Sequence, residues 1–182
     1  MTSYDPRLLL NDEPNHASEI GERLDDADRF VCMVAFAKES GFTILDEKLI
    51  KAVKRGMAAI FVIGTNFYQS QPTVIDKLLK LKKVGDVNVY MGSTERRYTF
   101  HPKLFLFEKG EDAHVIVGSA NWTGGGLSNN HELSVAFGKK ASEVSPQIAD
   151  WIDSLLSEGR FLKRLRDASR IMPGGMRSIL AA

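Results

Sequence analysis

Two residues in the middle of the chain, His101 and Lys103, have side chains and a spacing that suit chemistry on a phosphate ester. In an extended segment, residues two apart point to the same face, so the imidazole and the ammonium should lie side by side. An imidazole beside a fixed positive charge suits attack on an anionic phosphodiester, because the cation stabilises the charge on the phosphoryl oxygens. The pair therefore predicts a nucleophile or acid–base group next to a phosphate-binding ammonium.

A tight turn after a later apolar run carries further groups that suit phosphate. Gly118, Ser119 and Asn121 follow the run Val115–Val117. The backbone N–H groups of such a turn, the serine hydroxyl and the asparagine amide can all donate hydrogen bonds to phosphate oxygens. For Asn121 the alternative is a purely local role in the turn. For Ser119 the alternatives are support of Asn121 or of Glu132, or no role beyond its small size.

Glu132 begins an apolar strand, where an unpaired carboxylate is costly. Its natural partner is an imidazole N–H of His101, whose tautomer such a bond would fix, and the alternative is an exposed carboxylate at a strand end. No histidine pair stands at HExxH spacing, and the single cysteine cannot form a CxxC pair. We therefore expect no metal and no other cofactor, with Lys103 and Asn121 in place of a cation.

This pattern resembles the signature of the phospholipase D superfamily, H-x-K-x4-D followed by G-S-x-N. His101-Pro102-Lys103, the acidic residue Glu108 and Gly118-Ser119-Ala120-Asn121 stand in the order and spacing of that signature, with Glu in place of the usual Asp. The glutamate at 108 and the further Glu132 make the pattern most similar to the phospholipase D-type restriction endonucleases and related small nucleases. The resemblance implies a structural role for Glu108 and a catalytic site that includes His101.

The resemblance also implies two histidines in each active site. One attacks phosphorus and forms a phosphohistidine, and the other protonates the leaving oxygen and then activates water. Of the four histidines in this chain, His101 alone stands in an H-x-K pattern. One chain therefore carries one motif, and we expect a homodimer that brings two copies of His101, Lys103 and Asn121 together.

The surrounding segments predict an α/β fold with a mixed, largely parallel sheet flanked by helices on both faces, an α-β-α sandwich. Continuous apolar runs are typical of buried strands, and apolar stripes at helical spacing are typical of amphipathic helices. The expected strands are 30–37, 58–63, 87–91, 103–107, 115–117 and 133–137, and the expected helices are 17–24, 42–54, one opening at 72, 144–156 and 161–171. Residues 1–182 are expected to form a single domain, with a loose arm at 1–15 and a frayed tail at 172–182.

Length and composition narrow the class of protein. The chain has 182 residues, 43% hydrophobic and 26% charged, which is ordinary for a soluble globular domain. Its one cysteine, Cys32, lies in an apolar run, so a disulfide framework is not expected and a cytoplasmic location is. The N-terminus does not resemble a signal peptide, and no apolar run has the length of a membrane span, so no membrane partner is expected.

The substrate is predicted less directly than the chemistry. A net charge of +1 does not by itself indicate a nucleic-acid-binding protein, but Arg96, Arg97 and Tyr98 stand just before His101, where they suit contact with a nucleic-acid backbone. The sequence thus predicts a metal-independent endonuclease, with DNA favoured. The alternatives are a phospholipase or phosphatidyltransferase and a non-catalytic nucleic-acid-binding dimer. A recognition or helicase domain, in trans or in a larger architecture, is the further partner considered.

Overall fold

The computed structural model describes residues 5–92, 99–158 and 161–162. Their strands form one eight-stranded sheet in the order β1-β7-β6-β5-β2-β3-β4-β8. The strands are β1 (Arg7–Leu10), β2 (Arg29–Val34), β3 (Ala58–Ile63), β4 (Val87–Gly92), β5 (Lys103–Lys109), β6 (Asp112–Gly118), β7 (Leu133–Lys140) and β8 (Phe161–Leu162). The helices are α1 (His16–Leu24), α2 (Glu39–Arg55), α3 (Pro72–Leu81) and α4 (Ala141–Ser157), with short turns η1 (Asn66–Tyr68) and η2 (Gly125–Asn129).

The sheet is mixed, as predicted, but less parallel than predicted. Among the described strands, β2, β3 and β4 run parallel, and the remaining pairings are antiparallel. The parallel part comes from the β-α-β units in the first half of the chain, where α2 and α3 connect neighbouring strands. The turn between β5 and β6 is only Gly110 and Glu111, which forces a hairpin. The second half of the chain therefore contributes antiparallel strands.

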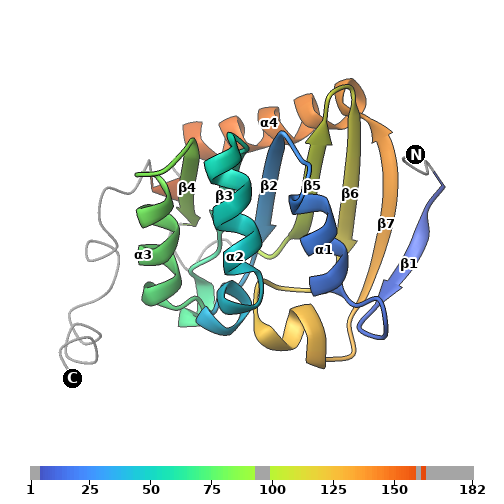
Figure 1. The fold of residues 1–182 in the computed structure, drawn as a ribbon. Helices are drawn as coiled ribbons and strands as arrows, with labels where there is room; N and C mark the ends of the chain where they lie inside the picture. Colours follow the sequence, from blue (N-terminus) through green and yellow to red (C-terminus); the bar gives the residue numbers. More distant parts are fainter. Residues whose placement is uncertain (1–4, 93–98, 159–160, 163–182) are drawn as a thin grey trace.

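Helices cover both faces of the sheet, which confirms the predicted sandwich. In Figure 1, α1, α2 and α3 lie across one face and α4 runs along the other. Successive residues of β2 point to opposite faces and are buried in both directions: Phe30 and Cys32 join the larger core, and Val31 and Met33 join the smaller one. The smaller core also contains Ile152 from α4. A strand buried on both sides explains why its sequence is continuously apolar.

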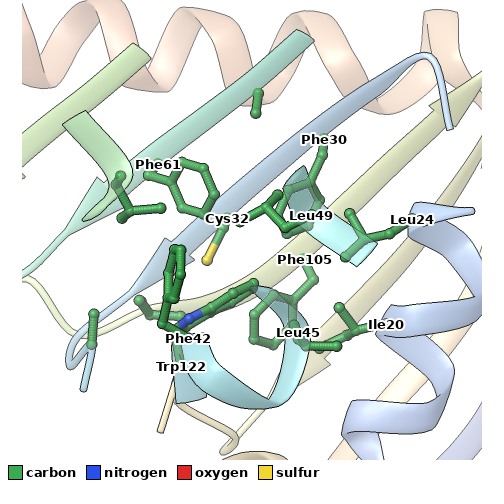
Figure 2. Packing of buried hydrophobic residues seen from close by; sticks show 14 of the residues in the cluster. Ile20, Leu24, Phe30, Cys32, Phe42, Leu45, Leu49, Phe61, Phe105 and Trp122 are labelled. Carbon is green, nitrogen blue, oxygen red and sulfur yellow. The ribbon is translucent and has the colours of Figure 1, made fainter. Parts of the chain in front are cut away.

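Aromatic rings form the centre of the larger core, as Figure 2 shows. The ring of Trp122 is only 1% exposed. It lies 5.9 Å from Phe61, 6.1 Å from Phe30 and 6.2 Å from Phe105, centroid to centroid. Such packing contributes through buried area and through edge-to-face contacts. Because Asn121 directly precedes this tryptophan, the core fixes the start of the loop that carries it.

The two ends of the described chain differ from the prediction. Residues 7–10 are not a loose arm: they form β1 at the edge of the sheet, paired with β7, with Leu9 only 2% exposed. The predicted helix 161–171 is wrong at its start, because Phe161 and Leu162 pair with β4 as a short strand. The rest of that helix and the predicted tail at 172–182 lie outside the described residues.

The buried carboxylate of Glu19 links helix α1 to strands β1 and β6. Its oxygens lie 2.5 Å from Arg7 Nη2, 3.1 Å from Arg23 Nη2 and 2.9 Å from His114 Nε2. The contact with His114, followed by the bond from Arg7, outweighs the opposing effect of burial and holds the pKa of Glu19 at about 2. The ionised side chain therefore connects β1, α1 and β6.

Since the pKa of Glu19 lies below its ordinary value of 4.5, the unfolded chain takes up the proton first as the pH falls. The stabilisation is complete above that ordinary value and is lost as the pH falls toward 2. We expect Glu19→Gln to lower the free energy of unfolding by about 2 kcal/mol at neutral pH, and by much less near the folded-state pKa. Urea unfolding at both pH values measures the difference, with Glu22→Gln on the exposed side of α1 as the control. An equal loss at both pH values would contradict this role for the carboxylate.

Candidate active site

The predicted site residues gather at one edge of the sheet, the lower edge in Figure 1. Lys103 begins β5 and His101 lies two residues before it. Gly118 ends β6, Asn121 follows that strand, and Glu132 directly precedes β7. Because β5, β6 and β7 are antiparallel neighbours, the start of one strand meets the end of the next at this edge. The carboxyl ends of β2, β3 and β4 reach the same edge, where open α/β sheets usually bind ligands.

His101 and Lys103 lie side by side, as their spacing predicted. The Lys103 Nζ is 2.6 Å from His101 Nδ1 and donates to the His101 carbonyl oxygen at 3.1 Å. Partial burial and then the neighbouring ammonium lower the pKa of His101 below 6.5. Partial burial also lowers the pKa of Lys103, an effect that the charge of Glu132 opposes. The imidazole is therefore neutral at pH 7, which a nucleophile requires.

The backbone around His101 is held by the neighbouring strands. Ala35 N–H donates to the carbonyl oxygen of Pro102 at 3.0 Å. The ring of Phe36 meets the imidazole edge-on, with 5.7 Å between centroids and 83° between planes. On the other side, Phe100 N–H donates to Asn66 Oδ1 at 3.0 Å. The imidazole is exposed, but the chain that carries it is tied to β2 and to the loop after β3.

Asn121 has its amide oriented by the backbone. Phe36 N–H donates to Asn121 Oδ1 at 3.0 Å, and Lys38 N–H donates to the carbonyl oxygen of Trp122 at 2.9 Å. In the described part of the chain, no acceptor takes a hydrogen bond from Asn121 Nδ2. The amide oxygen thus fixes the side chain, and the amide NH₂ is the group left to donate to a ligand.

Ser119 holds Glu132, which is one of the alternatives that the sequence left open. The hydroxyl donates to Glu132 Oε2 and accepts from Leu133 N–H at 3.0 Å. Asn130 Nδ2 donates to the other carboxylate oxygen, Oε1, at 3.2 Å. Among the described residues, no hydrogen bond joins Glu132 to His101 within one chain. The predicted orienting bond is therefore not made inside a protomer.

Gly118 is required by the close approach of two strands. A Cβ at this position would lie 2.4 Å from both the Leu133 carbonyl oxygen and Ser134 Oγ. Ser119 N–H donates to the same Leu133 oxygen at 3.1 Å. Only glycine lets β6 end this close to β7, and this contact places Ser119 against Glu132.

A buried polar network beneath Glu132 has no counterpart in the sequence prediction. His16 is fully buried, with Nδ1 2.5 Å from Asn11 Oδ1 and Nε2 2.8 Å from Ser134 Oγ. The Asn11 NH₂ donates to the carbonyl oxygens of Gly126 and Asn130 at 3.1 and 3.0 Å. Burial lowers the pKa of His16, so the ring is neutral and its Nδ1–H donates to the asparagine oxygen. The segment before α1 thereby fixes both ends of the 125–134 loop.

The remaining predicted residues lie elsewhere. Glu108 is at the opposite edge of the sheet, where it accepts from Arg29 Nη1 at 2.5 Å and Ser145 Oγ at 2.7 Å, a position that suits its predicted structural role. The predicted nucleic-acid contacts Arg96, Arg97 and Tyr98 lie outside the described residues. Within the described ranges, no three His, Cys, Asp or Glu side chains are grouped to hold a metal ion. No described helix combines the length and the apolar character of a membrane span.

Comparison with protein families matches residues 22–156 to the cardiolipin synthase, PLD-like domain. The comparison with curated proteins finds no significant match.

Among solved structures, the chain is similar to Nuc from Salmonella typhimurium, a phospholipase D family member, at 17% identity and a TM-score of 0.64, over 90% of this chain and 99% of Nuc. NucT from Helicobacter pylori matches at 14% identity and a TM-score of 0.61, over 87% of this chain and 98% of NucT. The phosphatidylserine synthase of Haemophilus influenzae Rd KW20 matches at 11% identity and a TM-score of 0.67, over 97% of this chain and 44% of the synthase. These similarities concern the fold.

The contact between Lys103 and His101 predicts a measurable electrostatic effect. We expect Lys103→Met to raise the pKa of His101 part of the way back toward 6.5, because the ammonium no longer opposes protonation of the ring. NMR titration of the histidine ring signals measures this pKa. Lys109→Met, at the far end of β5, is the matched control and should leave it unchanged. An unaltered His101 pKa in the Lys103 variant would show that the two side chains do not interact in solution.

Proposed function

The chain belongs to the phospholipase D superfamily of phosphodiesterases, in the family of cardiolipin synthase-type PLD-like domains, and on this premise we propose that it is a metal-independent endonuclease acting on DNA. The observation that carries the proposal is the neutral imidazole of His101, with the Lys103 ammonium 2.6 Å away. The Asn121 NH₂ at the same sheet edge supplies a second donor. Together these groups provide a nucleophile and donors for the phosphoryl oxygens without a cation.

In the proposed reaction, a ring nitrogen of His101 attacks phosphorus, the bond from phosphorus to the leaving oxygen breaks, and a phosphohistidine forms. The imidazolium of a second His101 gives its proton to the leaving oxygen. That second ring then takes a proton from water, and the resulting hydroxide attacks phosphorus and breaks the phosphorus–nitrogen bond. Lys103 and Asn121 hold the non-bridging oxygens throughout. Both histidines return to their starting states, so the atoms and charges balance.

The second His101 is proposed to come from a second copy of the chain. Of the other three histidines, His16 and His114 are buried, and His131 does not stand in an H-x-K pattern. The chain matches 99% of Nuc and 98% of NucT but only 44% of the phosphatidylserine synthase. This difference in size supports a one-motif unit that pairs with itself. We propose that Glu132, which bonds to no imidazole among the described residues of its own protomer, orients the His101 ring of the facing copy.

The alternative substrate is a phospholipid head group. It is favoured by the family description, cardiolipin synthase, and by the fold similarity to phosphatidylserine synthase. The nucleic-acid proposal is supported by the resemblance of the Glu108 and Glu132 pattern to small nucleases and by the basic pair Arg96-Arg97 before the catalytic histidine. A recognition or helicase partner and a cytoplasmic location remain predictions from the sequence.

Cleavage of single- and double-stranded DNA in excess EDTA tests the reaction. We expect cutting to continue, because no step needs a cation, and we expect His101→Ala to reduce it more than about a thousandfold while the protein stays folded. Lys51→Ala, on the exposed face of α2, is the control. Vesicles of phosphatidylglycerol and phosphatidylcholine are incubated in parallel. Loss of all cutting with EDTA would refute the mechanism, and head-group release without DNA cleavage would establish the lipid alternative.

A further inference from the structure

Two adjacent aromatic side chains stand in solvent at the active-site edge of the sheet. Phe67 is 62% exposed and Tyr68 is 55% exposed. They form most of η1, the turn that follows the carboxyl end of β3. Leaving both rings in water forgoes the stabilisation that burying them would give, so their exposure calls for a ligand as its explanation.

The backbone holds these rings outward. Phe67 has φ 61° and Tyr68 has φ 52°, the left-handed region that bulky residues adopt only where their surroundings impose it. Buried hydroxyls hold the residues on either side of the pair: Thr65 Oγ1 donates to the Gly92 carbonyl oxygen, and Ser70 Oγ donates to the Gly64 carbonyl oxygen, both at 2.7 Å. The turn is therefore tied down on both sides of the aromatic pair.

The same turn is bonded to the segment before β5 that carries the proposed nucleophile. Asn66 Oδ1 accepts from Phe100 N–H at 3.0 Å. Phe67 directly follows one partner of this bond, and His101 directly follows the other. The segment after the turn is also bonded to the chain that follows β2, since Ser70 Oγ accepts from Ala37 N–H at 3.1 Å. Ala37 directly follows Phe36, whose ring packs on the His101 imidazole. The rings thus lie at the rim of the site.

We propose that Phe67 and Tyr68 are a stacking platform for unpaired bases of a single-stranded nucleic acid whose phosphodiester lies on His101 and Lys103. The proposal rests on the proposed function and specifies its substrate. Aromatic rings bind successive bases through their faces, without regard to sequence, whereas the bases of a duplex are already stacked on one another. A substrate strand that leaves the phosphate site over η1 meets both rings.

The surroundings of the pair favour bases over a lipid surface. The other side chains of the turn are polar: Asn66, Gln69, Ser70 and Gln71. A loop that enters a membrane needs a larger apolar surface and commonly basic residues beside it, and neither is present between residues 65 and 71. A rigid presentation of two rings instead lowers the entropic cost of stacking a base on them.

Binding measurements in the His101→Ala background test the platform without cleavage. The probes are a fluorescein-labelled dT oligonucleotide and the same backbone with abasic sites, followed by fluorescence anisotropy. We expect the parent to bind the dT strand about tenfold or more tightly than the abasic strand. Adding Phe67→Ala and Tyr68→Ala should weaken dT binding by about the same factor and leave abasic binding unchanged, because ring and base act as one interacting pair. Phe67→Trp with Tyr68→Phe should restore the preference for bases.

Val84→Ala, which trims another exposed apolar residue, is the matched control, and thermal unfolding checks that every variant is folded. Equal binding of dT by the parent and by the double alanine variant would overturn the platform. Loss of binding to phosphatidylglycerol vesicles with unchanged dT binding would overturn it in favour of a lipid surface. If base-dependent binding is lost as expected but the wild-type protein cleaves no DNA, the platform stands and the proposed cleavage fails.

Discussion

An ammonium held 2.6 Å from an imidazole is the contact on which the site depends. Partial burial and then the neighbouring ammonium lower the pKa of His101 and favour its neutral form, the form that can act as a nucleophile. The charge of Glu132 acts on this ammonium, but among the described residues no ion pair joins the two side chains. An anionic phosphodiester is the ligand that satisfies this positive charge, because its oxygens accept from the ammonium while its phosphorus faces the ring.

The rest of the fold holds Asn121 and Glu132 in fixed positions near that contact. One support is the aromatic core, in which the buried Trp122 fixes the loop that presents the Asn121 amide. A second support is the polar network of Asn11, His16 and Ser134, which holds the loop leading to Glu132. The site therefore combines side chains from short loops with rigid anchors on strands and helices, which gives functional groups a defined geometry.

The sequence predicted those parts of the molecule that follow from local periodicity. The two-residue spacing of His101 and Lys103 places them together in any extended segment, and the apolar run of β2 required a strand buried on both faces. The asparagine–histidine network could not be predicted in this way, because its partners are separated by as many as 119 residues. The edge strand β1 was missed for the same reason, since only its pairing with distant β7 orders it.

Strand direction and side-chain partners were harder to predict than element positions. Alternating strands and helices favoured a mixed but largely parallel sheet, whereas β5 already runs antiparallel to β2 and the strands that follow it in the chain also pair antiparallel. Glu132 was expected to form a hydrogen bond with His101, but within a protomer its carboxylate accepts a hydrogen bond from the Ser119 hydroxyl. Nothing in the letters Phe67-Tyr68 indicates a left-handed backbone, so their outward position became visible only in three dimensions.

The central claim is that two copies of His101 act on one phosphorus, and subunit mixing tests it most directly. Wild-type and His101→Ala chains are unfolded, mixed in varying ratios, refolded and assayed for DNA cleavage in EDTA. If the site is shared, mixed dimers are inactive and activity follows the square of the wild-type fraction, so an equal mixture keeps about one quarter of the activity. Mixing with Lys51→Ala should leave activity unchanged. A linear dependence on the wild-type fraction would show that each chain acts alone and would contradict the account.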